Sequence, residues 1–260
     1  MSAGERVALV TGSTSGIGLA IARRLAREGF RMALHGFAPP EGVAAIEEAL
    51  RKLGAPQARH FEADLLQPAQ IERLMAAVAQ HHGRLDVLVN NAGIQHVAPI
   101  DQFPPERWDA ILAVNLSAAF HTTRLALPLM RARGWGRIVN IASVSGLVAA
   151  PMKAAYVAAK HGLVGLTKVT ALETATEAIT CNAICPGWVL TPLVERQLQA
   201  RHAAEGGSRE DVVRQLLVKQ PSQDFVTLEQ VAALAAYFVS DEAAQTRGVA
   251  WNLDGGYAAA

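Results

Sequence analysis

The sequence has almost no excess charge of either sign. Its 260 residues include 24 lysines and arginines against 23 aspartates and glutamates, which gives a formal net charge of +1 at pH 7. A protein that binds nucleic acid or an anionic membrane electrostatically needs a basic excess or patch, and no block of like charge supplies one. We therefore expect small-molecule partners or further copies of the chain, with no nucleic acid and no membrane among the partners.

Long apolar runs are also missing from the chain. No stretch approaches the roughly 20 apolar residues that span a bilayer. The opening "MSAGERVALVTG" places Glu5 and Arg6 before a short apolar run, and it has neither the length nor the cleavage pattern of a signal peptide. We expect a soluble, cytoplasmic protein.

Cysteine is scarce, and the only two, Cys181 and Cys185, lie in "ITCNAICPG". Their spacing is open to three interpretations: a metal half-site, a redox pair, or two buried strand thiols. No second pair of cysteines or histidines at ligand spacing completes a zinc site, which favours buried thiols. The eight histidines, including His81 and His82, form no metal motif, so we expect them to be surface or packing residues and expect no metal site.

Short β-branched runs alternate with longer amphipathic stretches rich in alanine and leucine. The predicted strands are "RVALVTG" (6–12), "RMALHGF" (31–37), "ARHFEAD" (58–64), "LDVLVNNAG" (85–93), "GRIVNIAS" (136–143), "ITCNAICPG" (179–187) and "VAWNLDGG" (249–256). Near-continuous apolar strands separated by helices are typical of a parallel sheet covered on both faces. We expect an α/β fold, a Rossmann-type doubly wound sheet of seven parallel strands. Residues 1–260 form a single domain in this prediction, because no linker or repeat divides them.

The least regular part of the chain is predicted at about residues 191–225, where "RHAAEGGSRED" interrupts charged helical stretches. This segment follows the sixth predicted strand at the carboxyl edge of the sheet, where ligands bind in such folds. One hypothesis is a mobile lid. A surface insertion without a gating role is the alternative.

A glycine-rich turn, "TGSTSGIG", joins the first predicted strand to the first helix. Gly12, Gly16 and Gly18 are spaced to let the backbone turn tightly and approach a pyrophosphate at the helix N-terminus. The free N–H groups and the helix dipole favour an anion there. This position between a strand and a helix predicts a nucleotide site.

The end of the second predicted strand, "HGFA", bears on the choice of cofactor. An acidic residue at this place usually binds a free ribose and a cation binds a 2′-phosphate, but positions 35–38 supply neither. Thr14 likewise stands at a turn position where a cation could have assisted a phosphate. With no cation aimed at a 2′-phosphate, the sequence favours NAD over NADP.

A tyrosine and two lysines occupy "KAAYVAAKHG". On a helix, Lys153, Tyr156 and Lys160 fall at positions i, i+3 and i+7 and share one stripe. A phenol titrates near ~10, and an adjacent ammonium lowers that pKa, as a general acid/base acting on an alcohol requires. The alanines between them leave room for a cofactor, a substrate or a partner helix. Without other support, a solvated helix carrying Tyr and Lys four residues apart would be the default interpretation.

Six motifs in order supply that support. They are "TGSTSGIG", "NNAG" (90–93), Asn115 in "LAVNLSAAF", Ser143 in "NIAS", "YVAAK" and "CPGWVLTP". Together they resemble the short-chain dehydrogenase/reductase family over nearly the whole chain. The resemblance implies a nicotinamide-dependent oxidoreductase.

The same resemblance implies four catalytic roles. Tyr156 would be the proton-transferring acid/base, and Lys160 would lower its pKa and bind the nicotinamide ribose. Ser143 would hydrogen-bond the substrate oxygen, and Asn115 would hold a water that links Lys160 to solvent. Considered alone, Ser143 and Asn115 would be interpreted as polar caps of a strand end and a helix.

The family pattern also implies a set of cofactor contacts. For Asp64 the alternative is the N-cap of the helix that follows. The implied contacts are Gly12, Thr14, Ser15, Gly16, Ile17, Gly18, Phe37, Asp64, Leu65, Asn91, Ala92, Gly93, Val114, Tyr156, Lys160, Pro186, Gly187, Trp188, Val189 and Thr191.

Longer stretches resemble one group within the family, the bacterial D-3-hydroxybutyrate dehydrogenases. These are "NNAGIQHVAPI", "YVAAKHGLVGLTKVTALETA", "CNAICPGWVLTPLVE" and "KQPSQDFVT". By this resemblance Gln95, Lys153 and Gln197 hold the substrate carboxylate, with Lys153 as the charged anchor. The implied substrate site comprises Gln95, Ser143, Ser145, Lys153, Tyr156 and Gln197. Taken alone, Lys153 and Gln197 would be interpreted as ordinary exposed residues.

Two residues depart from that group. Ser145 stands where a histidine is expected, and Tyr257 stands where a tryptophan is expected. A hydroxyl keeps one hydrogen bond but loses bulk and any positive charge, so the preferred acid could differ. The open alternatives are another hydroxy acid, a 3-oxoacyl carrier substrate, a sugar or cyclic alcohol, or a nucleotide-sensing regulatory protein without chemistry.

Two predicted helices carry extended apolar or small faces. One runs from Pro104 to about Arg133, and the other carries Tyr156. Relatives usually pair such faces between subunits with dihedral symmetry. We expect a homotetramer.

Overall fold

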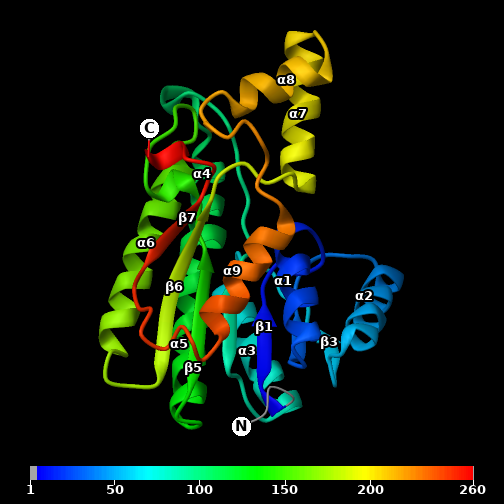
Figure 1. Ribbon diagram of the computed structural model, residues 1–260, viewed down its shortest axis with the longest axis vertical. Helices are drawn as coiled ribbons and strands as arrows, with labels where there is room; N and C mark the ends of the chain where they lie inside the picture. The colour runs from blue at the N-terminus through cyan, green and yellow to red at the C-terminus, as the bar shows by residue number, and fades with distance from the viewer. Residues whose placement is uncertain (1–4, 260) are drawn as a thin grey trace.

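Seven strands form one parallel sheet in the computed structural model, which describes residues 5–259 (Figure 1). The spatial order is β3-β2-β1-β4-β5-β6-β7, so the order reverses between β1 and β4. Every neighbouring pair is parallel. The strands are β1 (Val7–Val10), β2 (Arg31–Leu34), β3 (Ala58–His60), β4 (Val87–Asn90), β5 (Gly136–Ile141), β6 (Ile179–Pro186) and β7 (Ala250–Leu253).

All seven strands predicted from the sequence are confirmed, each shorter than the predicted segment. The residues that were predicted at the carboxyl ends of the strands but lie beyond the observed strand ends form the loops around the site. Cys181 and Cys185 are free and buried on β6, as predicted for strand thiols. His82 is buried at the end of the third helix, and its ring and that of His81 contact Phe61, which confirms a packing role for both histidines.

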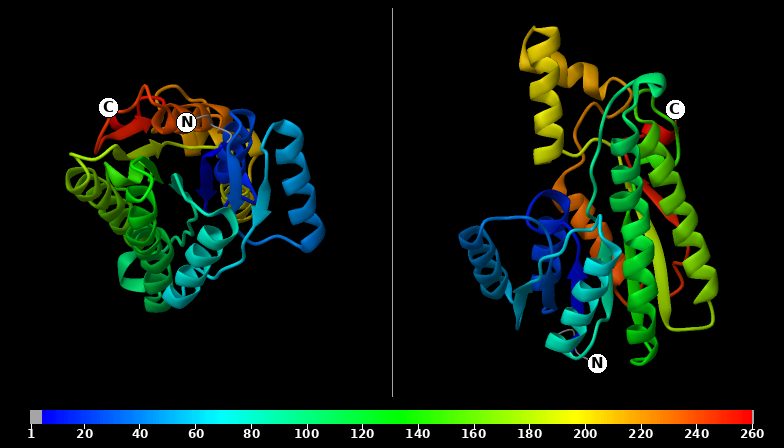
Figure 2. Two further views of the ribbon diagram at one scale, coloured as in Figure 1. Left: turned by 90° about the horizontal axis from the view of Figure 1, so that it is seen from below. Right: turned by 180° about the vertical axis from the view of Figure 1, so that it is seen from behind.

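Helices cover both faces of the sheet (Figure 2). On one face α1 packs against α9, with α2 beside α1, and on the other face lie α3, α5 and α6. Their bounds are α1 (Gly16–Arg27), α2 (Pro40–Leu53), α3 (Pro68–His82), α4 (Pro105–Leu112), α5 (Ala118–Arg131), α6 (Ala154–Glu173), α7 (Pro192–Glu205), α8 (Arg209–Leu217) and α9 (Leu228–Val239).

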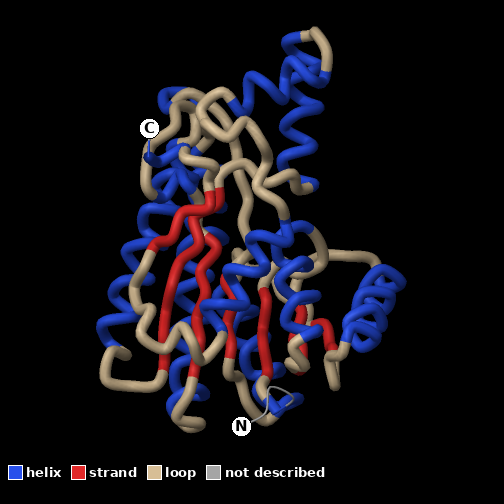
Figure 3. The backbone as a smooth tube through the Cα atoms, viewed as in Figure 1, coloured by secondary structure: helices blue, strands red, loops and turns tan. Residues whose placement is uncertain are grey.

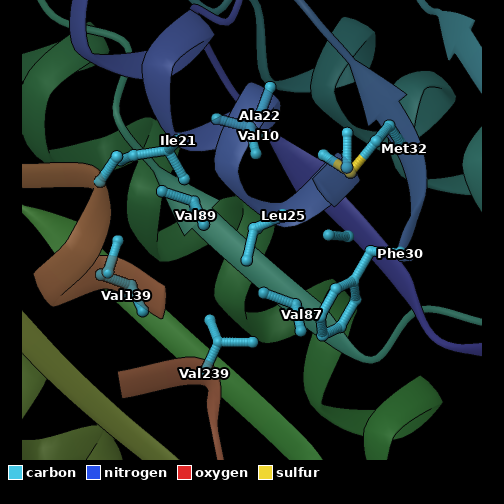
Figure 4. Close-up of a cluster of buried hydrophobic side chains, with 14 of the residues drawn as sticks. Val10, Ile21, Ala22, Leu25, Phe30, Met32, Val87, Val89, Val139 and Val239 are labelled. Atoms are coloured by element: carbon cyan, nitrogen blue, oxygen red, sulfur yellow. The ribbon is translucent and has the colours of Figure 1, made fainter. Parts of the chain in front are cut away.

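Strand β1 divides its side chains between two cores. Ala8 and Val10 belong to the cluster under α1 and α9, part of which Figure 4 shows. Val7 and Leu9 belong to the cluster under α3 and α5. All four side chains are fully buried, because successive residues of a strand point to opposite faces and both faces are covered.

The long helix predicted from Pro104 to Arg133 is a composite. Helix α4 continues through a π-helical segment, Ala113–Ser117, into α5. Over Pro105–Arg131 it is long and apolar enough, by length and a mean hydropathy of 1.2, to cross a membrane, which the sequence analysis did not anticipate. In the structure it packs against α3, α6 and the sheet, with 44% of its apolar stretch buried.

The segment at residues 191–225 is more regular than predicted. Helices α7 and α8 form a hairpin that stands beyond the carboxyl ends of the strands (Figure 3). Ser208 begins α8 with a capping box, in which its hydroxyl accepts from Asp211 N and the Asp211 carboxylate accepts from Ser208 N. The glycines of "EGGS" therefore separate two helices and do not mark an irregular region.

A buried polar network lies behind the site, between the sheet and two helices. Asn90 Nδ2 donates to Asn140 Oδ1 over 2.9 Å, and Thr122 Oγ1 donates to Asn90 Oδ1 over 2.7 Å. Asn140 Nδ2 in turn donates to Thr167 Oγ1 over 2.9 Å. These bonds connect β4 and β5 to α5 and α6, which fixes the helix carrying Tyr156 relative to the sheet.

Candidate active site

A cleft of about 780 Å³ opens at the carboxyl edge of the sheet. It crosses the point between β1 and β4 where the strand order reverses, as ligand sites do in this type of fold. All the predicted cofactor contacts line it except Gly18, which lies beneath the turn. Of the predicted catalytic and substrate residues, Ser143, Tyr156, Lys160, Gln95, Ser145 and Lys153 line the cleft as well.

The glycine-rich turn brings the N-terminus of α1 to the cleft. Gly12 and Gly16 have φ angles of +63° and +54°, which side chains rarely adopt. A Cβ on Gly18 would overlap Gly12 O and Asn91 Nδ2. Asn91 Nδ2 donates to Thr11 O over 2.8 Å and to Gly12 O over 3.1 Å, so the loop after β4 holds the turn from the other side.

The end of β2 presents a bulky aromatic and no cation. Phe37 is 73% exposed at the cleft, and Thr14 Oγ1 donates to Phe37 O over 3.2 Å. Among the described residues of the glycine-rich turn and positions 35–38, no lysine or arginine lines the cleft. Asp64 is not the N-cap of α3, which is Gln67; its Oδ1 instead accepts from Leu66 N over 2.9 Å at the cleft wall.

Tyr156 and Lys160 lie on α6, facing the end of β5. Lys160 Nζ donates to Ile141 O over 2.8 Å and lies 5.5 Å from the centre of the Tyr156 ring. Burial lowers the pKa of Lys160 to about 8. The Lys160 ammonium is therefore hydrogen-bonded to a carbonyl oxygen and buried from solvent, which favours its deprotonation.

The sequence analysis expected Lys160 to lower the pKa of Tyr156, and this effect of the lysine stays a prediction. Burial raises the pKa of the phenol, and a contact with the Ser143 hydroxyl offsets only part of that effect. Desolvation is the largest effect, although Tyr156 is only partly buried and lines the cleft.

Lys153 does not belong to the helical stripe predicted for it. It is the N-cap residue of α6, with φ −126° and ψ 36°, so only Tyr156 and Lys160 lie within the helix. Its Nζ is 4.5 Å from the centre of the Trp188 ring, a cation–π contact. Burial, and then the charge of Arg201, lower the pKa of Lys153 to about 8.

Two glutamines are hydrogen-bonded to each other at the cleft wall, which Gln95 lines. Gln197 Nε2, from α7, donates to Gln95 Oε1 over 3.1 Å, although residue 197 lies 102 positions further along the chain. Gln95 Nε2 is buried and has no hydrogen-bond partner among the described residues, so it can donate to an acceptor in the cleft. Ser145 is 7% exposed, and its N–H donates to Ser143 Oγ over 3.1 Å.

Asn115 lies in the π-helical segment, and its side chain forms two hydrogen bonds with the backbone of Ile94. Its Oδ1 accepts from Ile94 N over 2.9 Å and its Nδ2 donates to Ile94 O over 3.0 Å. A cavity of about 10 Å³ lies beside it, lined also by Thr11, Asn90 and Thr122, and this is close to the volume that one water needs. The helix widens here by one residue, as π-turns do at functional sites.

The sequence analysis missed several residues that line the cleft. His35 underlies the glycine-rich turn, and His96, Arg107 and Arg196 line the wall near the glutamines. Only the histidine of "HGFA" gave a signal, as a polar residue at the end of a buried strand. The two arginines stand on different helices, and their convergence depends on tertiary structure.

Replacement of Gly18 by alanine is expected to abolish cofactor binding. The new Cβ would overlap the Gly12 carbonyl, so either the turn or α1 must move. Calorimetric titration with NAD measures the loss. Gly165→Ala is the matched control, because this helical glycine has open space at its Cβ; equal affinities for the two variants would contradict the prediction.

Comparison with known proteins agrees with this geometry. Residues 6–202 match the family model described as short chain dehydrogenase. The chain is 55% identical over 255 residues to a D-beta-hydroxybutyrate dehydrogenase of Cupriavidus necator, covering 98% of each, and 51% identical to one of Rhizobium meliloti, covering 98% of this chain and 99% of that one. An actinorhodin polyketide ketoreductase with NADPH is similar in structure, with a TM-score of 0.91, 38% identity and 99% of each chain covered. The chain therefore belongs to the short-chain dehydrogenase family of oxidoreductases, which use a nicotinamide cofactor.

Proposed function

We propose that the protein is an NAD-dependent dehydrogenase that interconverts D-3-hydroxybutyrate and acetoacetate. One observation carries this proposal: Lys153 and Gln95 line the same cleft as Ser143 and Tyr156, and Gln197 is hydrogen-bonded to Gln95. A cationic and an amide donor there suit a carboxylate a few atoms away from a reacting hydroxyl. The D-beta-hydroxybutyrate dehydrogenases at 51% and 55% identity support the choice of substrate.

The proposed chemistry uses four side chains. Bound NAD would supply the hydride acceptor and, in its oxidised form, a positive charge. In the oxidation direction, Tyr156 accepts the hydroxyl proton while Ser143 donates a hydrogen bond to the same oxygen. Lys160 stabilises the phenolate, and Asn115 fixes the loop at Ile94 and lies beside the water-sized cavity. The raised pKa of Tyr156 makes phenolate formation depend on both positive charges.

The proposed cofactor is NAD, bound along the predicted contacts from the glycine-rich turn to Thr191. The support is the absence of lysine and arginine from the cleft wall formed by that turn and by positions 35–38. A 2′-phosphate would find no lysine or arginine partner there. The exposed Phe37 ring offers an apolar surface instead.

We also propose that α7 and α8 act as a lid. Thr191, Leu193, Val194 and Arg196 line the cleft from the start of this hairpin. Gln197 joins the hairpin to the opposite wall through its bond to Gln95. Limited proteolysis within residues 191–225 that does not change on addition of cofactor and substrate would remove the lid from the proposal.

The experiment that tests the function measures reduced-nicotinamide formation with NAD and with NADP. The substrates are D- and L-3-hydroxybutyrate beside longer, branched and neutral alcohols. Turnover of the D isomer with NAD supports the proposal and shows that Ser145 suffices at its position. Activity on another alcohol alone would overturn the substrate, and restoring histidine at position 145 would then be the first variant to make.

Tyr156→Phe is expected to lower kcat by roughly 10²–10⁴-fold, because the acid/base group is lost. The dissociation constant for NAD, measured by calorimetry, is expected to stay within about threefold, since the ring remains. Tyr237→Phe is the control, because Tyr237 lies on α9 outside the cleft lining and its hydroxyl lies 3.3 Å from Thr246 Oγ1. Retained turnover in Tyr156→Phe would refute the assigned role.

The KM for 3-hydroxybutyrate is expected to rise as pH increases beyond about 8. The folded pKa of Lys153 is depressed to about 8, so its ammonium is present below that pH and is lost above it. The expected rise approaches tenfold per pH unit, while Lys153→Met is expected to start about tenfold weaker at pH 7 and stay flat. Initial-rate kinetics from pH 7 to 9.5 measure both. A Lys153→Met KM within twofold of wild type would contradict this role.

We propose a homotetramer, because two separate exposed apolar patches suit the two interfaces of dihedral symmetry. One patch spans α5 and α6, with Phe120, Val169 and Leu172, and the other joins α9 and β7 through Tyr237 and Trp251. Sedimentation velocity is expected to give four times the 27.6 kDa chain mass. A stable monomer at micromolar concentration would count against this assembly.

A further inference from the structure

His35 lies at the carboxyl end of β2, directly beneath the glycine-rich turn. Its side chain is 2% exposed. Its backbone N–H donates to Ser13 Oγ over 3.0 Å, and its carbonyl accepts from Ser13 N over 2.7 Å. The main chain of His35 is thus hydrogen-bonded to the turn at Ser13.

The two ring nitrogens of His35 have different partners. Nε2 lies 3.0 Å from Ala63 O, which can only accept, so Nε2 carries the hydrogen. Nδ1 lies 3.3 Å from Gly12 N, which can only donate, so Nδ1 is an acceptor. Only the neutral ring with hydrogen on Nε2 satisfies both contacts.

Gly12 is consequently held at both ends by side chains. The His35 ring accepts from its N–H, and Asn91 Nδ2 donates to its carbonyl over 3.1 Å. The φ angle of Gly12, +63°, starts the reversal that aims the first turn of α1 at the cleft. Protonation of Nδ1 would place a donor against the Gly12 N–H, so the ring and the turn would separate.

The surroundings of His35 favour its neutral form. Burial lowers its pKa most strongly, the Ala63 carbonyl opposes this, and the charge of His60 lowers the pKa further. His60 Nε2, on β3, lies 2.7 Å from Gly36 O. The Asp64 carboxylate accepts from Leu66 N, and α1 has no acidic residue in its first turn. Among the described residues of these elements, no carboxylate is hydrogen-bonded to the ring.

We propose that His35 is a positioning residue for the nicotinamide cofactor, whose neutral imidazole sets the Gly12 peptide and thereby makes cofactor affinity depend on pH. The inference rests on the cofactor-binding part of the proposed function and is independent of the substrate. Binding selects the neutral ring, so it releases a proton where the free protein is partly protonated. Affinity rises with increasing pH through the depressed pKa of His35 and levels off above it.

Calorimetric titration with NAD, without substrate, tests this between pH 5 and 8. His35→Asn places an oxygen near the position of Nδ1 that can accept from Gly12 N and does not titrate. Its dissociation constant is expected to stay within about threefold of wild type at pH 8 and to remain flat with pH. His35→Phe leaves the Gly12 N–H unpaired and is expected to bind about tenfold more weakly or worse at every pH.

Titration in two buffers with different ionisation enthalpies counts the protons released on binding. Wild type is expected to release protons at the acidic end of the pH range and His35→Asn to release none, whereas a purely structural histidine would leave the two equal. His121→Asn on α5 is the control and should match wild type. Parallel pH profiles for wild type and His35→Asn would overturn the proposal. If only NADP binds, the same comparison with NADP decides it, and only the choice of NAD fails.

Discussion

The close approach of Gly18 to the Gly12 carbonyl and to Asn91 is the constraint on which the rest of the site depends. It brings the first turn of α1 against the ends of β1 and β4, at the reversal of strand order. The loop that carries Asn91 continues to Ile94. The backbone of Ile94 forms two hydrogen bonds with the side chain of Asn115 in the π-helical segment. Each later part of the site is thus positioned relative to this one contact between backbones.

The proton-handling groups lie in an environment that disfavours charge. Burial lowers the pKa of Lys160 and raises that of Tyr156, so both groups are shifted toward their neutral forms. The Lys160 ammonium donates to the carbonyl oxygen of Ile141. A buried pair of this kind responds strongly to any charge that enters the cleft, because little solvent screens it. The charge of a bound cofactor would therefore change the pKa values of both groups, because both are poorly solvated.

The sequence predicted the features that depend on short-range pattern. The strands, their parallel arrangement and the glycine-rich turn followed from apolar runs and glycine spacing, and the structure confirms them. What it could not predict depends on distant contacts. Lys153 is the N-cap of α6, and its non-helical backbone angles place it outside the helix. The hydrogen bond from Gln197 to Gln95 joins residues 102 positions apart. The raised pKa of Tyr156 follows from burial, which a count of neighbouring charges does not reveal.

Strand β7 ends the sheet with a largely uncovered edge. Its central residues Trp251 and Asn252 are exposed, and Trp251 contacts Tyr237 and Phe238 of α9. An unpaired edge carrying an exposed indole is a template for uncontrolled association between chains. Pairing of subunits at this edge would therefore protect the folded chain against aggregation, and dilution would remove that protection before it affected any residue of the cleft.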